Sequence, residues 1–205
     1  MRVWRAVAVA LVHVLLTAAV VGAVVVWGFG DDPELAGQRV TVPDTDLRLP
    51  DNPERLVLVR PPGFLVMDST TVKAGNSPDV LGDIESDVLS GAGVVAVKAR
   101  VARDDGVSQG VWQMAVHDGA DPRDAQRAID ALYEQGGWTR AYTAHDGVLL
   151  RTQTPSEGQP FTGYRAHYVL GPYLIRIEAY GTDKDRVDQA FATLATRQLT
   201  EWPPG

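Results

Sequence analysis

An uninterrupted apolar stretch near the amino terminus limits what the start of this chain can form. It covers 24 residues, 6–29, as AVAVALVHVLLTAAVVGAVVVWGF, with His13 and Thr17 as its polar residues and no acidic, Lys or Arg side chain. A helix of this length spans about 36 Å, which exceeds the roughly 30 Å hydrocarbon core of a bilayer. The sequence therefore predicts one transmembrane helix over residues 6–29.

Charges on the two sides of this stretch predict its orientation. Arg2 and Arg5 precede it, whereas the other side opens with acidic residues. Because Lys and Arg are retained on the cytoplasmic side, the stub at residues 1–5 is expected in the cytoplasm and residues 31–205 outside.

A cleaved secretory signal is the alternative interpretation. The apolar region of such a signal runs for about 7–15 residues and ends at a small-residue cleavage site. The candidate site here, VGA at residues 21–23, is followed by the further apolar run VVVWGF. The continued run favours a retained, single-pass anchor in the cell membrane.

Composition excludes several classes of site and partner. The chain has no cysteine, so disulfides, thiolate metal sites, cysteine nucleophiles and lipidation at a cysteine are excluded. Its net charge is -7; once Arg2 and Arg5 are set aside, 17 basic and 26 acidic side chains remain. A domain this acidic is a poor general binder of nucleic acid, and we expect no nucleic-acid partner.

Proline content separates a tether from the domain that follows it. Six of the 13 prolines lie in residues 30–63, with many acidic residues and no helical periodicity, which predicts an extended extracytoplasmic tether. Within it, the apolar run at residues 56–59 is interpreted as an edge strand. Strand and helix patterns cover residues 64–200, and residues 201–205 form a tail.

Hydrophobic periodicity divides residues 64–200 into strands and helices. The strands are expected at residues 64–67, 94–103, 110–118, 137–143, 148–153, 161–170 and 173–180. Helices are expected to begin at Ser77, Asp121 and Thr182, which are good N-cap residues, and proline follows the first two. The apolar face of the first helix is expected to comprise Val80, Leu81, Ile84, Val88 and Leu89, with its carboxylates in solvent.

The order of these elements predicts an α+β fold: an antiparallel sheet with helices packed on it, in two ββα-like units. The two long hairpins match at an offset of 61 residues, so their apolar sides are expected to share one face. The matched residues are Trp112, Met114 and Val116 with Tyr173, Ile175 and Ile177.

The dipeptide Gly171-Pro172 predicts the register of the last hairpin. Proline excludes a type I′ turn, whereas a type II′ turn needs a positive φ only at its first central residue, which glycine supplies. A two-residue turn places Leu170 opposite Tyr173. The polar residues of both strands then lie together on the side opposite the apolar pairs.

The polar sides of the two long hairpins suggest a binding surface. Six side chains are expected to point away from the helix-covered face, with Glu178 as the opposing charge. They are Lys98, Arg100, His117, Arg165, His167 and Arg176. On an acidic domain, this basic sheet face favours an anionic envelope ligand or an acidic segment of a partner protein. Two other interpretations stay open: a solvated sheet face, or a face covered by the acidic helix at residues 78–89.

Signatures of catalysis are missing from the sequence, which contains no G-x-S-x-G, Walker, G-x-G-x-x-G or H-E-x-x-H motif. The pairs His117-Asp118 and His145-Asp146 lie at strand ends or turns, where Asp is common, and no nucleophile pattern accompanies them. We expect no catalytic residue, no metal site and no cofactor, and we expect that the chain is not an enzyme.

The order helix, hairpin, helix, hairpin, hairpin, helix behind an anchor resembles the Mog1/PsbP-like α/β sandwich of some bacterial envelope lipoproteins, although the lipidated cysteine is missing. It is also similar to extracellular sensor domains of anchored bacterial kinases. The resemblance covers residues 64–200 and implies a binding or accessory module in the bacterial cell envelope. The alternative is a small subunit of a membrane complex that contacts partners through its transmembrane helix, where Ala18 and Gly22 supply small residues.

Overall fold

A computed structural model describes residues 56–68, 72–73, 80–156 and 158–205 of the chain. The predicted anchor at residues 6–29, most of the tether and the predicted helix start at Ser77 lie outside the described residues. Among the described residues, no helix combines the length and the apolar composition that a membrane crossing requires.

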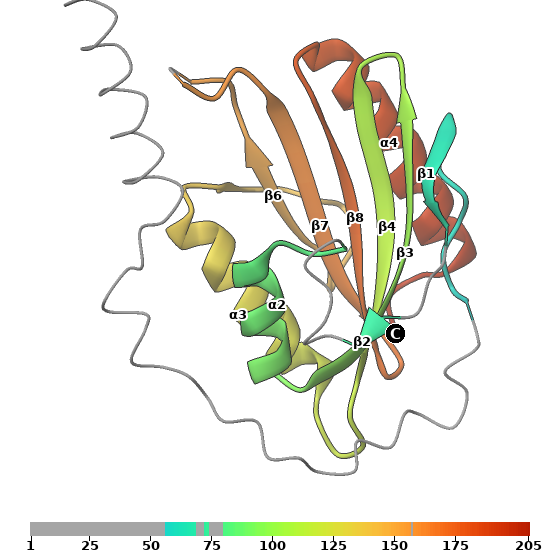
Figure 1. Cartoon of the computed structure of the whole chain (residues 1–205), viewed down its shortest axis with the longest axis vertical. Coiled ribbons are helices and arrows are strands. Elements are labelled where there is room, and N and C mark those ends of the chain that lie inside the picture. Colours follow the sequence, from blue (N-terminus) through green and yellow to red (C-terminus); the bar gives the residue numbers. More distant parts are fainter. Residues whose placement is uncertain (1–55, 69–71, 74–79, 157) are drawn as a thin grey trace, which may run out of the picture. The chain divides into compact units, whose positions relative to one another are not determined.

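An antiparallel sheet forms the centre of the domain (Figure 1). Its strands are β1 (Phe64–Asp68), β2 (Val72–Lys73), β3 (Val94–Asp104), β4 (Val107–Val116), β5 (Thr139–Ala141), β6 (Leu149–Gln153), β7 (Thr162–Leu170) and β8 (Tyr173–Gly181). Seven of them lie in the order β1-β3-β4-β8-β7-β6-β5, and β2 pairs with β3 beside this path. The two long hairpins, β3–β4 and β7–β8, meet where β4 pairs with β8.

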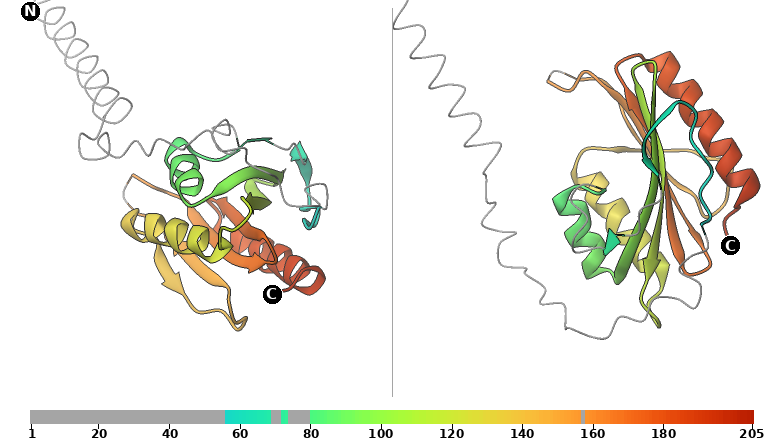
Figure 2. Two further views of the ribbon diagram at one scale, coloured as in Figure 1. Left: turned by 90° about the horizontal axis from the view of Figure 1, so that it is seen from below. Right: turned by 45° about the vertical axis from the view of Figure 1, so that its right-hand side comes forward.

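Helices cover both faces of this sheet. In Figure 2, α2 (Asp83–Gly91) and α3 (Pro122–Gln135) lie on one face, and α4 (Lys184–Glu201) lies on the other. The expected α+β class with an antiparallel sheet is therefore confirmed. The division of the helices between two faces was not expected, and it makes both sides of the central strands interior.

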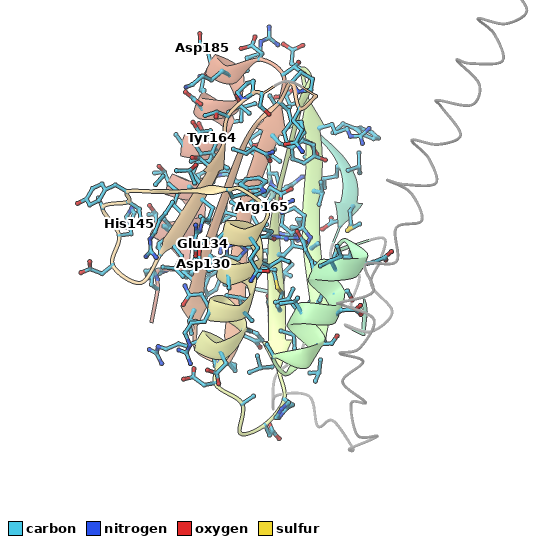
Figure 3. The ribbon with its side chains drawn as sticks, turned by 90° about the vertical axis from the view of Figure 1, so that its left-hand side faces the viewer. Asp130, Glu134, His145, Tyr164, Arg165 and Asp185 are labelled. Atoms are coloured by element: carbon cyan, nitrogen blue, oxygen red, sulfur yellow. The ribbon has the colours of Figure 1, made fainter. Side chains whose placement is uncertain are left out.

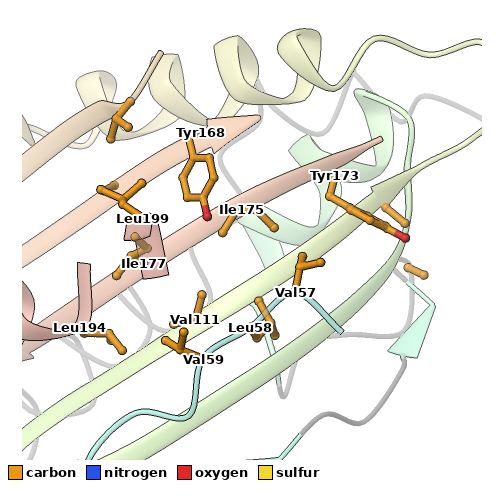
Figure 4. Packing of buried hydrophobic residues seen from close by; sticks show 14 residues of the cluster. Val57, Leu58, Val59, Val111, Tyr168, Tyr173, Ile175, Ile177, Leu194 and Leu199 are labelled. Atoms are coloured by element: carbon orange, nitrogen blue, oxygen red, sulfur yellow. The ribbon is translucent and has the colours of Figure 1, made fainter. Parts of the chain in front are cut away.

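Each face has its own hydrophobic core. Leu89 of α2 and Ile129 of α3 are buried with Met114 of β4 on the first face. Leu194 of α4 and Ile175 of β8 are buried in one cluster on the second face, and Figure 4 shows both among its side chains. The central strands therefore carry apolar side chains on both sides.

The predicted start of α3, with Asp121 as N-cap and proline after it, is confirmed. The helix begins at Pro122, and the carboxylate of Asp121 accepts a hydrogen bond from the backbone N–H of Arg123. Gly136 forms the C-cap. Asp and Pro at these positions satisfy and pre-organise the first turn, which is why the start could be predicted.

The β7–β8 hairpin also follows its predicted register. Leu170 lies opposite Tyr173, Arg165 opposite Glu178, and every pair between them agrees. Gly171 has a φ of +55°, in the left-handed region that the first central residue of a type II′ turn requires.

The start and the inward face of α2 differ from the prediction. The helix begins at Asp83, after Gly82 as N-cap, and Ile84 is 60% exposed although it was expected in the core. Glu85 points inward instead, because two arginines of the sheet neutralise its carboxylate. Glu85, and not Ile84, therefore faces the sheet.

The start of α4 differs by one residue. Asp183, and not Thr182, is its N-cap, and the Asp183 carboxylate accepts from the backbone N–H of Arg186. A carboxylate at this position also interacts favourably with the positive end of the helix dipole, which a threonine hydroxyl cannot match.

Residues 56–59 are part of the core and form no strand. Val57, Leu58 and Val59 are buried among side chains of the sheet and α4 (Figure 4). Side chains hold this backbone: Gln113 Oε1 accepts from Val57 N, and Gln198 Oε1 accepts from Val59 N. The edge-strand interpretation is therefore wrong, and the folded part begins before the expected residue 64.

Candidate functional site

The six residues of the predicted basic sheet face do not share one surface. Three of them, Arg165, His167 and Arg176, lie on the face that α2 and α3 cover, with His167 and Arg176 buried and Arg165 half-buried. This is the helix-covered alternative that the sequence left open. The acidic helix contacts Arg165 and Arg176 through Glu85, whereas His167 lies against α3, with its ring centre 5.4 Å from that of Tyr133.

The other three predicted residues lie elsewhere. Arg100 is on the α4 side of the sheet, where its Nη1 donates to the backbone oxygen of Leu58 at 2.8 Å. Lys98 lies opposite Gln113 on that same side. His117 follows the end of β4, where its Nδ1 lies 2.9 Å from the oxygen of Asp118.

The register between β4 and β8 explains this separation. Trp112 pairs with Arg176, and Gln113 pairs with Ile175. The apolar side of the first hairpin therefore continues into the polar side of the second. The expectation that the two apolar sides share a face was wrong, because a shift of one residue exchanges the two faces of a strand.

Two arginines and two glutamates form a buried charge cluster under α2: Glu85, Arg165, Arg176 and Glu178. Glu85 accepts from Arg165 Nη1 and from Arg176 Nη1, each at 2.7 Å. Glu178 Oε2 lies 2.7 Å from Arg165 Nε and 3.9 Å from Arg176 Nε. The formal charges of the charge cluster cancel, as buried charges require.

Aromatic rings enclose the two guanidinium groups. The Arg165 guanidinium carbon lies 4.6 Å from the ring centres of both Tyr133 and Trp138, and that of Arg176 lies 4.4 Å from Trp112. The Tyr133 hydroxyl accepts from Arg176 and donates to Glu85, each at 2.8 Å. These cation–π contacts help to hold the two arginines in place.

The buried surroundings lower the pKa of two side chains, Glu85 and His167. Burial alone would raise the pKa of Glu85, but Arg176 and Arg165 outweigh it and lower the pKa to about 2. Burial lowers the pKa of His167 to about 3, and the nearby Arg176 and Arg165 add to the effect. Glu85 is therefore ionised and His167 neutral at physiological pH.

A second ion pair fixes α3 to the sheet. Arg151 of β6 donates to both carboxylate oxygens of Asp130 at 2.8 Å and to Glu134 at 3.1 Å. Figure 3 shows Asp130 and Glu134 on α3 below Arg165. This bidentate contact fixes the end of α3 beside the charge cluster.

A pocket of about 660 Å³ opens beside the charge cluster. This aromatic pocket is defined here by Arg103, Trp138, Phe161, Arg165, Glu178 and Tyr180. Its volume falls within the range of about 300–1,000 Å³ typical of small-molecule sites. Arg165 and Glu178 belong to both features, so the open pocket reaches the buried charges.

A second hollow of about 530 Å³ lies along residues 140–149 and includes His145 and Asp146. Tyr142 in this loop is 91% exposed. Throughout the described ranges, no three His, Asp or Glu side chains gather in a way that could hold a metal ion. We take the aromatic pocket as the candidate site because it shares Arg165 and Glu178 with the charge cluster.

Glu85 and Tyr133 at the charge cluster were missed at the sequence level. Four residues of the aromatic pocket were also missed: Arg103, Trp138, Phe161 and Tyr180. A signal for Glu85 exists, since it lies four residues from both Leu81 and Leu89, which are buried. A carboxylate on the apolar stripe of a helix predicts a buried cationic partner. Tyr133 was expected on the apolar face of its helix, but its hydroxyl contacts depend on tertiary packing.

Comparisons with known proteins found one structural similarity. No family model matches the chain, and no curated protein matches it. The extracellular domain of PknH from Mycobacterium tuberculosis has a TM-score of 0.39 and 13% sequence identity, over 67% of this chain and 82% of that chain. A similarity at this level carries no functional assignment.

Proposed function

We propose that this chain is a membrane-anchored extracytoplasmic binding or accessory module of a bacterial cell envelope, and that it acts without catalysis. The apolar residues 6–29 and the arginines before them support the anchor and its orientation. The aromatic pocket supports binding, because aromatic walls around a few fixed polar groups are typical of ligand sites.

One observation carries the binding role: an open pocket borders a charge cluster whose formal charges cancel and whose arginines are held by ion pairs and aromatic rings. Arg165 is enclosed by Tyr133 and Trp138 and ion-paired to Glu85 and Glu178. A ligand would meet polar groups held in place before it arrives, which lowers the entropic cost of binding.

Photo-crosslinking in the native membrane tests this role. A photoreactive amino acid replaces Tyr180 at the pocket rim in the full chain. The matched control replaces Tyr142, which is exposed in the loop at residues 140–149. A discrete adduct at 180 and none at 142 is expected, read by gel shift and by intact mass. No adduct at 180, or equal adducts at both positions, contradicts a binding role for the pocket.

The alternative, a subunit that acts through its membrane helix, requires a separate variant. Residues 6–29 are replaced by polyleucine of equal length, which keeps an anchor but removes Ala18 and Gly22. We expect the adduct at 180 to persist in this variant. Its loss would favour the membrane-helix alternative.

A carboxyl-terminal fusion tests the orientation. Alkaline phosphatase fused after Gly205 is expected to be active, and a fluorescent protein that folds only in the cytoplasm is expected to be dark. The reversed pattern would place residues 31–205 in the cytoplasm and contradict the extracytoplasmic assignment.

A further inference from the structure

Arg103, on the lining of the aromatic pocket, has a side chain without a partner in the described part of the chain. It is exposed, and no hydrogen bond, ion pair or ring contact there involves its guanidinium group. The two carboxylates next in sequence do not pair with it: Asp104 follows on the opposite face of β3, and Asp105 is ion-paired to Arg186. Arg103 therefore adds an uncompensated positive charge to the pocket.

The other charges on this lining are already paired. Arg165 is ion-paired to Glu178 and to Glu85, each at 2.7 Å. The paired atoms Arg165 Nε and Glu178 Oε2 are buried, so a ligand in the pocket does not reach them. With two arginines and one glutamate on the lining, the excess charge is positive and belongs to Arg103. The electrostatics of the pocket therefore favour an anion.

The strand register places Arg103 in one row with the aromatic wall of the pocket. Arg103 of β3 pairs with Ser108 of β4, which pairs with Tyr180 of β8. Tyr180 in turn pairs with Gly163 of β7. Side chains of residues paired across antiparallel strands point to the same face of the sheet. Because neighbouring strands lie about 4.8 Å apart, the row from β3 to β7 spans about 14 Å.

Aromatic side chains form the far end of this row. Trp138 lies against the backbone of Gly163, where an added Cβ would come within 2.9 Å of Trp138 Cη2. Phe161 also lines the pocket, and Tyr180 is 41% exposed. In Figure 1, α2 and α3 lie over the lower half of the sheet, whereas the β3–β4 turn, which contributes Gly106 to the lining, lies at its upper end. This aromatic surface suits the apolar part of a ligand.

We infer that the aromatic pocket binds a small, elongated organic anion. Its negatively charged group pairs with Arg103, whose planar guanidinium matches a carboxylate or phosphate, and its apolar body packs on Tyr180 and Trp138. The volume of about 660 Å³ accommodates a drug-sized molecule. A compact inorganic anion is too short to make both contacts across a row of about 14 Å. The inference rests on the proposed binding role and names the ligand class of that same site.

Titrations of the purified full chain in phosphatidylcholine nanodiscs test this ligand class. The main probe is 6-phenylhexanoate, which joins a carboxylate to a ring through a flexible chain, and 6-phenylhexanamide is its neutral counterpart. Acetate and inorganic phosphate are the compact anions, and empty nanodiscs correct for partition into lipid. Saturation-transfer NMR and tryptophan fluorescence report binding. We expect 6-phenylhexanoate to bind saturably, with a Kd about 3- to 10-fold lower than that of the amide, and the compact anions not to saturate.

Substitutions at the two ends of the row separate the charge contact from the ring contact. Arg103→Gln should reduce the preference for the carboxylate over the amide to less than about twofold, while the affinity for the amide stays the same. Tyr180→Ala should weaken both probes by about 3- to 10-fold. The matched controls Arg123→Gln and Tyr142→Ala are exposed and lie outside the pocket lining, so they should change neither value. Near-ultraviolet circular dichroism confirms that each variant is folded.

Four outcomes would overturn the inference. They are no saturable binding of 6-phenylhexanoate, equal affinity for the amide, a preference for the carboxylate that Arg103→Gln leaves intact, and compact anions that bind as tightly as the long probe. Equal affinity for the amide would mean that the pocket recognises apolar surface alone. None of these outcomes removes the proposed binding role, because the adduct at position 180 in native membranes tests that role separately.

Discussion

Arg176 is a charged residue that lies in the interior of the domain. Its side chain is 2% exposed and contacts Glu85, the Tyr133 hydroxyl and the Trp112 ring. Each contact replaces part of the hydration that burial removes. An arginine in this position cannot serve as a surface contact for a partner, so its value lies in fixing α2 and α3 on the sheet.

Removal of this guanidinium should be costly. We expect Arg176→Met to lower the free energy of unfolding by about 3–5 kcal/mol, because Glu85 would lose a partner while staying buried. Urea unfolding of residues 56–205 measures the change. Arg103→Met, at an exposed position, is the control and should change it by less than about 0.5 kcal/mol. Equal effects of the two substitutions would contradict a structural role for the charge cluster.

His167 and Glu85 predict how stability depends on pH. The unfolded chain protonates histidine near 6.5, but folded His167 stays neutral until its pKa of about 3, so unfolding binds a proton between these values. Glu85 behaves likewise between 4.5 and about 2. Both shifts therefore make the folded state lose stability as the pH falls, first below about 6.5 and then further below about 4.5.

Substitution of His167 separates the two windows. We expect His167→Phe to remove up to about 1.4 kcal/mol of this loss per pH unit between about 6.5 and 4.5, measured by urea unfolding at several pH values. His145→Phe, in the exposed loop, is the matched control. If both variants keep the slope of the unmodified chain, His167 is not the group responsible.

At the scale of elements, residues 56–62 are attached to the sheet and α4 without belonging to a strand. Gln198 accepts from Val59 N and donates to the oxygen of Val57, and Gln109 donates to the oxygen of Pro62. Side-chain amides suit this task because each carries both a donor and an acceptor. A buried backbone outside regular structure thus has its hydrogen bonds satisfied by three glutamines, Gln113 included.

Gln198→Leu should release this segment. We expect a loss of about 2–5 kcal/mol in the free energy of unfolding, since buried backbone groups of Val57 and Val59 lose their partners. Amide hydrogen exchange at Val59 should accelerate in the same variant. Gln135→Leu, at the exposed end of α3, is the matched control and should do neither. Unchanged protection at Val59 would show that packing alone holds the segment.

At the scale of the whole domain, the sheet lies between two layers of helices, so a site can open only where these layers leave the sheet uncovered. α4 and residues 56–59 cover one face of the sheet, and α2 and α3 cover part of the other. The aromatic pocket opens on that second face beside the charge cluster. Arg165 and Arg176, which the sequence placed on an open basic face, are therefore covered by helices. The part of the charge cluster that borders the aromatic pocket stays accessible.

The position of residues 56–59 predicts the minimal folded unit. A chain of residues 56–205 should unfold cooperatively, whereas one of residues 64–205 should lack a cooperative transition. Loss of Val57, Leu58 and Val59 removes about 1.5–3 kcal/mol for each buried side chain, a sum comparable to the total stability of a domain. Thermal unfolding by circular dichroism compares the two. Equal melting temperatures would mean that these residues add nothing to the core.

Local sequence determined those features whose causes are local. Asp121-Pro122 and Gly136 determined the bounds of α3, because capping acts within one turn. Gly171-Pro172 determined the β7–β8 register, because a two-residue turn permits one alignment of the strands. The start of α2, with glycine and no side-chain cap, lacked such a signal, and its prediction failed.

Only the tertiary structure decided which sides of the two long hairpins lie together. The pairing of Trp112 with Arg176 joins strands that are far apart in sequence, and no turn between them sets their register. A shift of one residue would exchange the two faces of β8, so alternation alone predicts two sides without saying which helix covers each. The sequence by itself determined the elements and the last hairpin. Burial of Arg165 and Arg176 against Glu85 depended on long-range packing, because a charge enters the interior only where distant parts of the chain supply its partners.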